Sequence, residues 1–397
     1  MGKIKHICVI ADGYPSEYLV KNAFVETLAN AMLDSGVSCT VIAMQSLSRV
    51  ALRKEKKLPD CRVRHTPQGN RVTVWTAHYF SASNKRIGPV RTAAFGLHSA
   101  QSSVERIFKK LLQTETFDVI YGHFINSAGI IANYLGQKYH IPAFFAYGES
   151  STNTIDRLGD DKTRELLRGI AGVVSVSTEN KRVLIDKNMV PAEKIGVFPN
   201  SVDTGCFYPR DRAQMRRELG FPQDGFIVAF VGRFLDVKGP DRLSAALDSL
   251  QDDNIYSVFI GDGPLKPTCR NILHCGPLQH DEIPRYLSAA DLFVLPTKAE
   301  GCCNAIVEAM ACGLPIISSN LPFNADILDE DRAIMIDPTD VDAIARAIRQ
   351  MKENTPVRQE KAHAALQTAR SLSIDRRAQN ILAFMGDICN NGQEASI

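Results

Sequence analysis

The stretch FIVAFVGRFLDVKGPDRLSAALDSL (226–250) decides the fold class, because it joins a short apolar run to a helical segment through a turn rich in glycine and charge. Its first seven residues, FIVAFVG, form a continuous apolar run, as expected of a strand buried on both faces. Pro240 then stands where a proline opens a helix. A buried strand followed at once by a helix is typical of a parallel sheet covered by helices.

The same alternation extends in both directions from this stretch and predicts two parallel α/β units. The segment PNSVDTGCFYPRD (199–211) lacks apolar periodicity and is the predicted linker between them. The two halves repeat an architecture and not a sequence. Further strands are predicted at 6–11, 38–44, 71–75, 117–122, 143–148, 172–177, 195–200, 256–263, 271–276, 291–296 and 314–319. Helices are predicted at 24–33, 240–250, 304–313, 340–352, 357–370 and 374–389.

Composition sets the outer limits. A chain of 397 residues suggests two or three domains. The content of 45% hydrophobic and 23% charged residues excludes a disordered, collagen-like or coiled-coil protein. The net charge of +2 gives no indication of nucleic-acid binding, but it hides an asymmetry. Residues 1–199 carry 26 Lys and Arg against 17 Asp and Glu, whereas residues 200–397 carry 20 against 27.

The ten cysteines are scattered through the chain and form no C-x-x-C pair. Only a short apolar run precedes Asp12, and no apolar stretch reaches the roughly 20 residues that span a bilayer. These features predict reduced thiols in a cytoplasmic chain without a zinc site.

The most informative motif is EGCCNAIVE, which starts at Glu300 and ends at Glu308. Glu300 falls in the loop after a predicted strand, and Glu308 falls about one turn into the next helix. The free N–H groups near Asn304, Ala305 and Ile306 form an anion site at the start of that helix. Each carboxylate can accept two hydrogen bonds from vicinal hydroxyls. The motif therefore fits a sugar joined to a diphosphate, although the spacing alone is equally compatible with two solvated glutamates.

A second motif, GRFLDVKG, starts at Gly232 and supplies Arg233 and Lys238. Both cations are expected at the same sheet edge as Glu300, because the carboxyl ends of parallel strands meet there. Arginine binds phosphate in a bidentate manner and lysine adds a point charge, so the two could stabilise a diphosphate leaving group without a metal. Taken alone, the pattern also fits two solvated surface cations.

Together these motifs resemble the retaining glycosyltransferases of family 4, in particular bacterial members that build polysaccharides and capsules. PNSVDTGCFYP, IGDGPL, CGPLQHDEIPRYLSAADLFVLPT and the strand-end His123 follow the family pattern in the same order. The resemblance covers nearly the whole chain. It is strong over 195–320 and weaker over 45–115.

The resemblance implies the GT-B fold, in which two Rossmann-like parallel-sheet domains face a cleft. It places an acceptor-side domain at 1–198, the linker at 199–211 and a nucleotide-sugar-binding domain at 212–371. The final segment, 372–397, would cross back to the N-terminal domain.

It also implies a role for each motif residue. Four are implied to act on the reacting groups: Arg233, Lys238, Glu300 and His123. Eight are implied to bind the donor: Gly13, Gly232, Leu278, His280, Asn304, Ala305, Ile306 and Glu308. In this scheme the two cations hold the diphosphate, Glu300 and His123 contact the sugar, and Glu308 binds the ribose. Leu278 and His280 line the base.

One loop departs from the family pattern. Members commonly carry a Gly-Gly pair in the first loop, but here the loop reads ADGYPSEYLVKNAF with only Gly13. Asn22 and Ala23 stand near the place of that pair, and Lys21 could add a cation or be solvated. The segment 318–328 also replaces an expected glycine-containing loop and forms either a wall of the sugar site or an ordinary loop.

Other enzyme classes fit poorly. The chain lacks the G-x-G-x-x-G, P-loop and G-x-S-x-G motifs that dehydrogenases, P-loop enzymes and serine hydrolases carry. Asp340-x-Asp342 fits a metal-binding D-x-D, but helix capping explains Asp340. Two alternatives remain open: a nucleotide-sugar epimerase or hydrolase on the same fold, and a non-catalytic protein that binds sugar nucleotides.

The sequence therefore predicts a retaining, metal-independent enzyme that moves a sugar from a UDP-linked donor to a glycan or lipid-linked acceptor. No cofactor and no nucleic-acid partner are expected. The basic segment LRKEKKLPDCRVRH (52–65) either rests on the anionic inner face of the cytoplasmic membrane or is a solvated loop.

Overall fold

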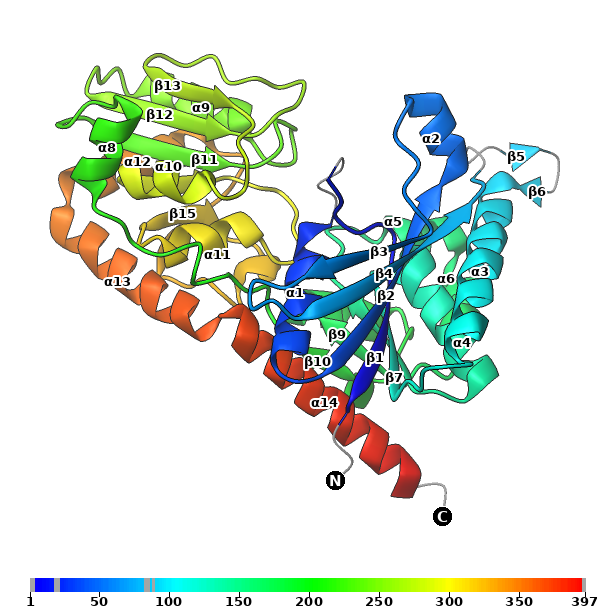
Figure 1. Cartoon of the computed structure of the whole chain (residues 1–397). Coiled ribbons are helices and arrows are strands. Elements are labelled where there is room, and N and C mark those ends of the chain that lie inside the picture. The colour runs from blue at the N-terminus through cyan, green and yellow to red at the C-terminus, as the bar shows by residue number, and fades with distance from the viewer. Residues whose placement is uncertain (1–3, 18–21, 82–85, 88–89, 395–397) are drawn as a thin grey trace. The chain divides into compact units, whose positions relative to one another are not determined.

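The computed structural model describes residues 4–17, 22–81, 86–87 and 90–394. The chain divides into two compact units (Figure 1). The first contains the described residues of Met1–Val176, Asn180–Phe198 and Ala378–Ile397, and the second contains Ser177–Glu179 and Pro199–Arg377. Each unit is an α/β layer structure built on its own sheet.

The first unit is built on an eight-stranded sheet that is parallel except at one edge, where β3 pairs antiparallel with β4. Short runs of Val, Ile, Phe and Ala make its central strands, and these strands are buried on both faces. In spatial order the strands are β10 (Ile195–Val197), β9 (Gly172–Ser175), β8 (Ala143–Tyr147), β7 (Val119–His123), β1 (His6–Ala11), β2 (Ser38–Ser46), β4 (Arg71–Tyr79) and β3 (Cys61–His65). A separate two-stranded ribbon pairs β5 (Arg86–Ile87) with β6 (Val90–Arg91).

Helices cover both faces of this sheet, as expected of right-handed crossovers between parallel strands (Figure 1). They are α1 (Ala23–Asp34), α2 (Leu47–Arg53), α3 (Thr92–Leu111), α4 (Ile130–Tyr139), α5 (Asn153–Leu158), α6 (Asp160–Leu167) and α7 (Thr178–Asp186), with short turns η1 (Ile125–Gly129) and η2 (Ala192–Lys194). The last helix, α14 (Ile374–Glu394), belongs to this unit from Ala378 on. Phe384 of α14 packs against Phe144 and Phe198, with ring centroids 6.2 Å and 5.4 Å apart.

The second unit is built on a six-stranded parallel sheet. In spatial order its strands are β13 (Ile272–Gly276), β12 (Ile255–Ile260), β11 (Phe226–Val231), β14 (Leu292–Leu295), β15 (Ile316–Ser319) and β16 (Ala333–Ile336). Its helices are α8 (Arg212–Leu219), α9 (Pro240–Ser249), α10 (Ile283–Ala289), α11 (Asn304–Ala311), α12 (Val341–Glu353) and α13 (Thr355–Ser371), with the turn η3 (Pro322–Asn324). β11 and β14 are neighbours, and Ala229 lies opposite Phe293. The loops that follow these two strands therefore leave the sheet side by side.

The amino edge of this second sheet is closed by a buried ion pair. Arg216 of α8 donates to Oδ2 of Asp291 at 2.6 Å, and its other guanidinium N–H groups donate to the carbonyls of Ala289, Gln223 and Gly225. Asp291 also accepts the N–H of Ile227 at 2.7 Å. Every polar group of this buried pair has a partner, which is the condition under which burying charge is tolerated.

Most predicted elements are confirmed, and the differences have local causes. The fold class is as predicted, with two parallel-sheet α/β units. The side chain of Asp340 accepts the N–H of Ala343 at 2.8 Å, which confirms the capping role that made it a poor metal ligand. The prediction gave no bounds for α2 to α8, α10, β3, β5, β6 and β16; most of these elements are short, but α3 is a helix of 20 residues. β3 lies inside the basic segment 52–65, where charged residues hide its alternation.

Candidate functional site

Two loops at the carboxyl edge of the second sheet bring the predicted charged residues together. Residues 232–239 follow β11 and residues 296–303 follow β14. Within these loops, Nζ of Lys238 donates to Oε1 of Glu300. The hydroxyl of Thr297 donates to the same oxygen at 3.3 Å. The predicted neighbourhood of these motifs is therefore present inside one unit.

Arg242, a residue that the sequence analysis did not single out, is hydrogen-bonded to both of these loops. Its side chain is buried, and its guanidinium donates to the carbonyls of Asp236, Pro296 and Pro338 at 2.7 to 2.9 Å. It also pairs with Oδ1 of Asp236 at 2.9 Å. Its only sequence signal is a charged residue on the buried face of α9, where an apolar residue is expected.

A third loop, which follows β12 and starts at Gly261, reaches the same edge of the sheet because it contains glycines at two close contacts. A Cβ at Gly261 would lie 1.9 Å from the carbonyl oxygen of Gly232, and one at Gly263 would lie 2.5 Å from that of Phe234. This close approach lets Phe234 donate its N–H to the carbonyl of Asp262 at 2.8 Å. The segment therefore holds Gly232 and the exposed Arg233 at a fixed edge of the sheet.

Glu308 lies on α11, and its side chain is only 13% exposed. Its Oε1 lies 3.1 Å from Nε2 of His280, which comes from the loop after β13. The hydrogen bond with Glu308 raises the pKa of His280 above its ordinary value, and desolvation works against this rise. The ring of His280 also packs edge-on against Phe207, with centroids 5.1 Å apart. The predicted ribose and base residues are thus direct neighbours.

The first turn of α11 begins at Asn304, after Cys303 at the N-cap position. Asn304 and Ala305, the first two residues of the helix, are half-buried. Ile306 is fully buried, so the structure exposes neither its side chain nor its backbone. Leu278 is half-buried after β13.

The segment 318–328 stands directly behind the Glu300 loop. The hydroxyl of Ser319 donates to the carbonyl of Thr297 at 2.5 Å, and Ser318 donates to the carbonyl of Leu295 at 3.0 Å. The amide of Asn324, which is fully buried, donates to the carbonyl of Ser319 at 2.8 Å. This segment braces the loop that carries Glu300.

In the first unit, His123 ends β7 and is 94% buried, with 6% of its surface exposed. Aromatic rings surround it. Its ring centroid lies 5.2 Å from that of Phe24, 4.9 Å from that of Phe124 and 6.0 Å from that of Tyr121. Sequence reasoning missed this aromatic collar, because Phe24 is about one hundred residues away in the chain.

The first loop replaces its missing glycine with asparagine. Asn22 has φ 59° and ψ 41°, the left-handed conformation that glycine adopts readily and that asparagine tolerates better than most residues. Its side-chain amide donates to the carbonyl of Gly13 at 3.3 Å. Asn22 therefore provides at the start of α1 the backbone shape that a glycine pair would allow. Lys21 lies outside the described residues.

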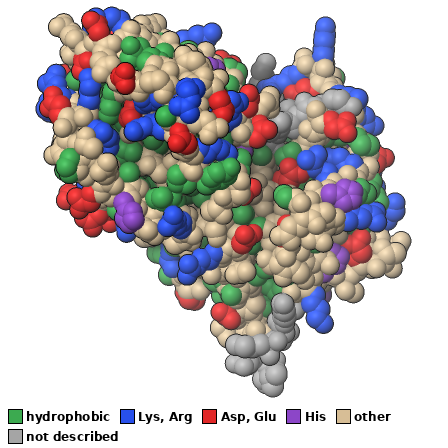
Figure 2. Space-filling model, turned by 60° about the vertical axis from the view of Figure 1, so that its left-hand side comes forward, with side chains coloured by type: hydrophobic (Ala, Val, Ile, Leu, Met, Phe, Trp, Pro, Cys, Tyr) green, Lys and Arg blue, Asp and Glu red, His purple; other side chains and the backbone are tan. Residues whose placement is uncertain are grey.

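Two arginines of the basic segment 52–65 make hydrogen bonds or ion pairs with residues of the first unit. Arg62 donates to the hydroxyl of Thr76 at 2.9 Å and to the carbonyl of Tyr14 at 3.3 Å. Arg64 pairs with Glu26. On the face in view in Figure 2, acidic and basic side chains are interspersed.

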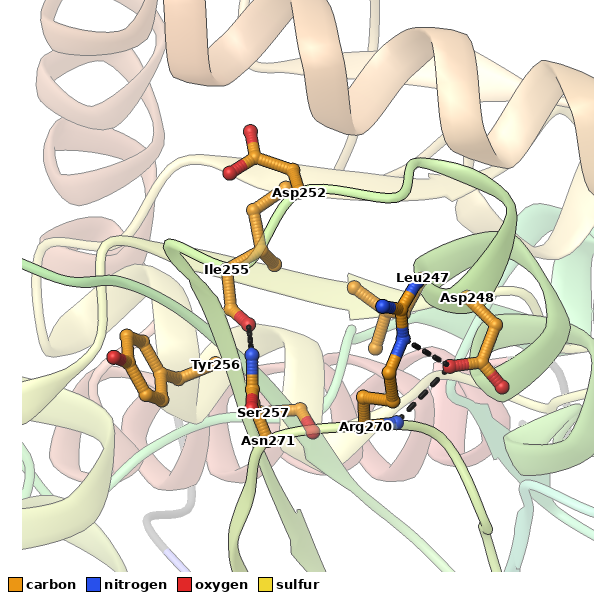
Figure 3. Close-up of a pocket in the computed structure, with 8 residues that line it drawn as sticks. All are labelled: Leu247, Asp248, Asp252, Ile255, Tyr256, Ser257, Arg270 and Asn271. Carbon is orange, nitrogen blue, oxygen red and sulfur yellow. Dashed lines mark hydrogen bonds and ion pairs between the residues drawn. The ribbon is translucent and has the colours of Figure 1, made fainter.

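A small cavity in the second unit lies at the opposite, amino edge of the sheet (Figure 3). Its lining includes Asp248 and Arg270, whose Oδ1 and Nε lie 3.9 Å apart, and Ile255 and Ser257 of β12. It is therefore remote from the Glu300 loop. Among the described residues, no group of three or more His, Cys, Asp or Glu side chains is arranged to hold a metal ion. The helices in the described part of the chain include none long and apolar enough to cross a membrane.

Comparison with known families agrees with this arrangement. Residues 211–371 match the family model of group 1 glycosyl transferases, and residues 22–205 match that of glycosyltransferase family 4. The chain belongs to the family 4 glycosyltransferases. All ten cysteines of this family member are free thiols.

Curated relatives of this glycosyltransferase family member come from bacteria and from a plant, and three bacterial ones illustrate the range. TuaC of Bacillus subtilis, named for teichuronic acid biosynthesis, is 27% identical over 61% of this chain and 63% of its own length. The UDP-Gal:alpha-D-GlcNAc-diphosphoundecaprenol alpha-1,3-galactosyltransferase of Escherichia coli is 27% identical over 60% of this chain and 67% of its own. A D-inositol 3-phosphate glycosyltransferase of Salinispora tropica is 31% identical over 51% of this chain and 48% of its own. The matches thus span about half to two thirds of these relatives.

Solved structures show the same fold at low identity. A sucrose-phosphate synthase of Thermosynechococcus elongatus has a TM-score of 0.76 at 18% identity and covers 98% of this chain and 100% of its own. HepE of Anabaena, solved with UDP, has a TM-score of 0.71 at 17% identity, with 97% and 100% covered. These neighbours establish the GT-B fold for the family member described here.

Proposed function

We propose that this family member transfers a sugar from a UDP-linked donor to a glycan or lipid-linked glycan, with retention of anomeric configuration, in the synthesis of a surface polysaccharide. One observation carries the proposal. Arg233, Lys238, Glu300 and Glu308 all lie at or beside the carboxyl edge of one parallel sheet, where nucleotides bind in open α/β folds.

Each of these side chains suits one part of a nucleotide sugar. Arg233 and Lys238 offer the positive charge that a departing diphosphate needs. Glu300 and the backbone at Asn304 and Ala305, at the start of α11, suit the hydroxyls of the transferred sugar. Glu308 suits the ribose.

We assign the remaining predicted contacts on the same basis. Leu278 and His280 line the base, and Gly232 and Gly13 allow backbone to approach the phosphates. His123, held in its aromatic collar, contacts the sugar.

Relatives support the choice of donor and acceptor. The Escherichia coli relative is named for UDP-Gal and for a diphosphoundecaprenol-linked acceptor. HepE was solved with UDP-glucose. A UDP-linked donor and a lipid-linked acceptor are therefore the first pair to test.

The reaction needs no enzyme nucleophile in this scheme. The bond between the anomeric carbon and the donor phosphate oxygen breaks, and a bond to the acceptor oxygen forms on the same face. The acceptor proton passes to the departing phosphate oxygen. Arg233 and Lys238 neutralise the charge that develops there, so we propose metal-independent catalysis.

A panel of UDP-, GDP- and ADP-sugars, assayed for nucleotide release with and without lipid-linked acceptors, tests the proposal. We expect acceptor-dependent release of UDP and an unchanged anomeric configuration by NMR. Release of free sugar without acceptor would favour a hydrolase, isomerised donor would favour an epimerase, and donor binding without any turnover would favour a non-catalytic role. An inverted product would refute the same-face mechanism.

We further propose that the first unit touches the inner face of the cytoplasmic membrane. Helix α2 exposes Leu52 to 84% and carries Arg49 and Arg53 beside it. An exposed apolar side chain among cations suits an anionic lipid surface. Flotation with anionic vesicles should recover the wild type, and Leu52→Glu should reduce recovery. Equal recovery of the wild type with neutral vesicles would refute the electrostatic part.

A further inference from the structure

Glu149 stands beside His123 at the carboxyl edge of the first sheet, and the assigned roles leave it unused. It follows β8, which pairs in parallel with β7. His123, the last residue of β7, lies opposite Ala146 of β8. Glu149 therefore comes three residues after the register partner of His123.

The carboxylate of Glu149 holds two backbone N–H groups. Oε1 accepts the N–H of Ile125 at 2.9 Å, and Oε2 accepts the N–H of Gly148 at 3.0 Å. Ile125 is the second residue after His123 and opens the turn η1. One oxygen is thus hydrogen-bonded to the turn after β7, and the other is hydrogen-bonded to the residue that follows the end of β8.

The turn that Glu149 grips has an unfavourable backbone. Phe124 has φ 72° and ψ 155°, and Ser127 has φ 46° and ψ −66°. A non-glycine residue at positive φ is energetically unfavourable, so surrounding contacts must hold the turn in place. The bond from Ile125 to Glu149 is one of these contacts, and the bond from the Gly129 N–H to the Phe124 carbonyl, at 2.9 Å, is another.

This turn sets the surroundings of His123. The ring of Phe124 stands edge-on to the ring of His123 with centroids 4.9 Å apart, and the ring of Phe24 stands edge-on to that of Phe124 at 5.7 Å. A shift of the Phe124 backbone would move the ring that packs on His123. A path of direct contacts therefore runs from Glu149 through Ile125 and Phe124 to His123.

We propose that Glu149 is a positioning residue, whose carboxylate clamps the turn after β7 and thereby orients His123 toward the transferred sugar. The inference rests on the sugar contact proposed for His123. It adds a residue that touches neither donor nor acceptor and acts through the backbone of its neighbour.

Glu149→Gln tests the clamp, because its amide nitrogen cannot accept a hydrogen bond and one of the two N–H groups loses its partner. Glu105→Gln is the matched control. Glu105 is another carboxylate of the first unit, but it accepts hydrogen bonds from Tyr134 and Tyr139 of α4 and not from the turn at 124–129. Hydrogen exchange followed by mass spectrometry should show faster exchange at 124–129 in Glu149→Gln and no change there in Glu105→Gln. Unchanged exchange at 124–129 in Glu149→Gln would overturn the clamp, whether or not the sugar donor is known.

A double-mutant cycle tests the link to His123. We expect Glu149→Gln to lower kcat about tenfold, with the KM for the donor changed less than about twofold, because misplacing a contact group affects the transition state most. In the His123→Ala background the same substitution should cost less than about twofold. Independent, multiplying losses would overturn the positioning role. If the wild type turns over no sugar nucleotide, the proposed function fails while the exchange result still decides the clamp.

Discussion

Nζ of Lys238 donates to Oε1 of Glu300, so the cation assigned to the donor diphosphate and the carboxylate assigned to the sugar neutralise each other within the second unit. The two side chains are 21% and 10% exposed. Removing one partner leaves a largely buried charge without compensation. Loss of catalysis and loss of charge balance must therefore be separated in any test of this pair.

Lys238→Ala should lower kcat by roughly 100-fold or more, because one cation at the leaving diphosphate is lost in the transition state. Arg233→Ala should have a similar effect. Acceptor-dependent nucleotide release measures both. The double variant Lys238→Ala/Glu300→Gln should regain the stability that the single variant loses, but not its turnover.

Lys352→Ala is a control for that prediction. Lys352 is 22% exposed and pairs with Asp252, but it lies toward the amino edge of the same sheet. Its removal should leave kcat within about twofold. If Lys238→Ala were no slower than Lys352→Ala, Lys238 would have no place in the mechanism.

Arg242→Met should lower the free energy of unfolding by about 3 kcal/mol, because three carbonyl groups and the Asp236 carboxylate lose a buried charged donor. Urea unfolding measures the change. We also expect a lower kcat, since the Lys238 and Glu300 loops lose their shared anchor. A variant with wild-type stability and wild-type activity would show that the two loops keep their conformation without Arg242.

His280 predicts a pH dependence of nucleotide binding. Because Glu308 raises the pKa of His280 above 6.5, the ion pair contributes stability that is fully present below pH 6.5 and is lost as the pH rises through the folded-state pKa. Protonated His280 also competes with the ribose for Glu308. Calorimetric UDP affinity should therefore increase with pH across this range, and His280→Ala should flatten the profile. A variant that keeps the wild-type slope would assign the titration to another group.

Glu105 predicts acid sensitivity of the first unit. The hydrogen bond from Lys138, with further ones from Tyr139 and Tyr134, lowers the pKa of Glu105 from 4.5 to about 2. Its contribution to stability is present above pH 4.5 and disappears as the pH falls toward 2. Melting temperatures between pH 2 and 6 should therefore fall more steeply for the wild type than for Glu105→Gln. Parallel curves would contradict this assignment.

The fold could be predicted from the sequence where strands are continuous apolar runs, as in FIVAFVG and DLFVLP. The neighbourhood of Lys238 and Glu300 could also be predicted, because parallel strands share one carboxyl edge. Strand β3 could not, since alternating arginines on an exposed edge look like a charged loop.

The residues that support the site could not be predicted from the sequence for a different reason. Arg242 and Glu149 act through backbone groups in the loops that follow the strands, and which loops lie together depends on strand order and register. No spacing along the chain encodes such a contact. Asn22 was noticed only as a departure from a glycine pair, and its left-handed backbone explains the substitution.

The closed amino edge of the second sheet has a consequence for how this enzyme can be altered. Arg216 and Asp291 make their hydrogen bonds with residues inside 212–227 and 289–291, so this edge forms one self-contained hydrogen-bonded unit. The loops at the opposite edge leave the same strands without touching it. Chimeras of two family members that exchange only the segments after β11, β13 and β14 should therefore take on the sugar preference of the donor of these segments and keep the rest of the second unit unchanged. Chimeras whose crossover point lies among the hydrogen-bonded residues of the amino edge should be insoluble.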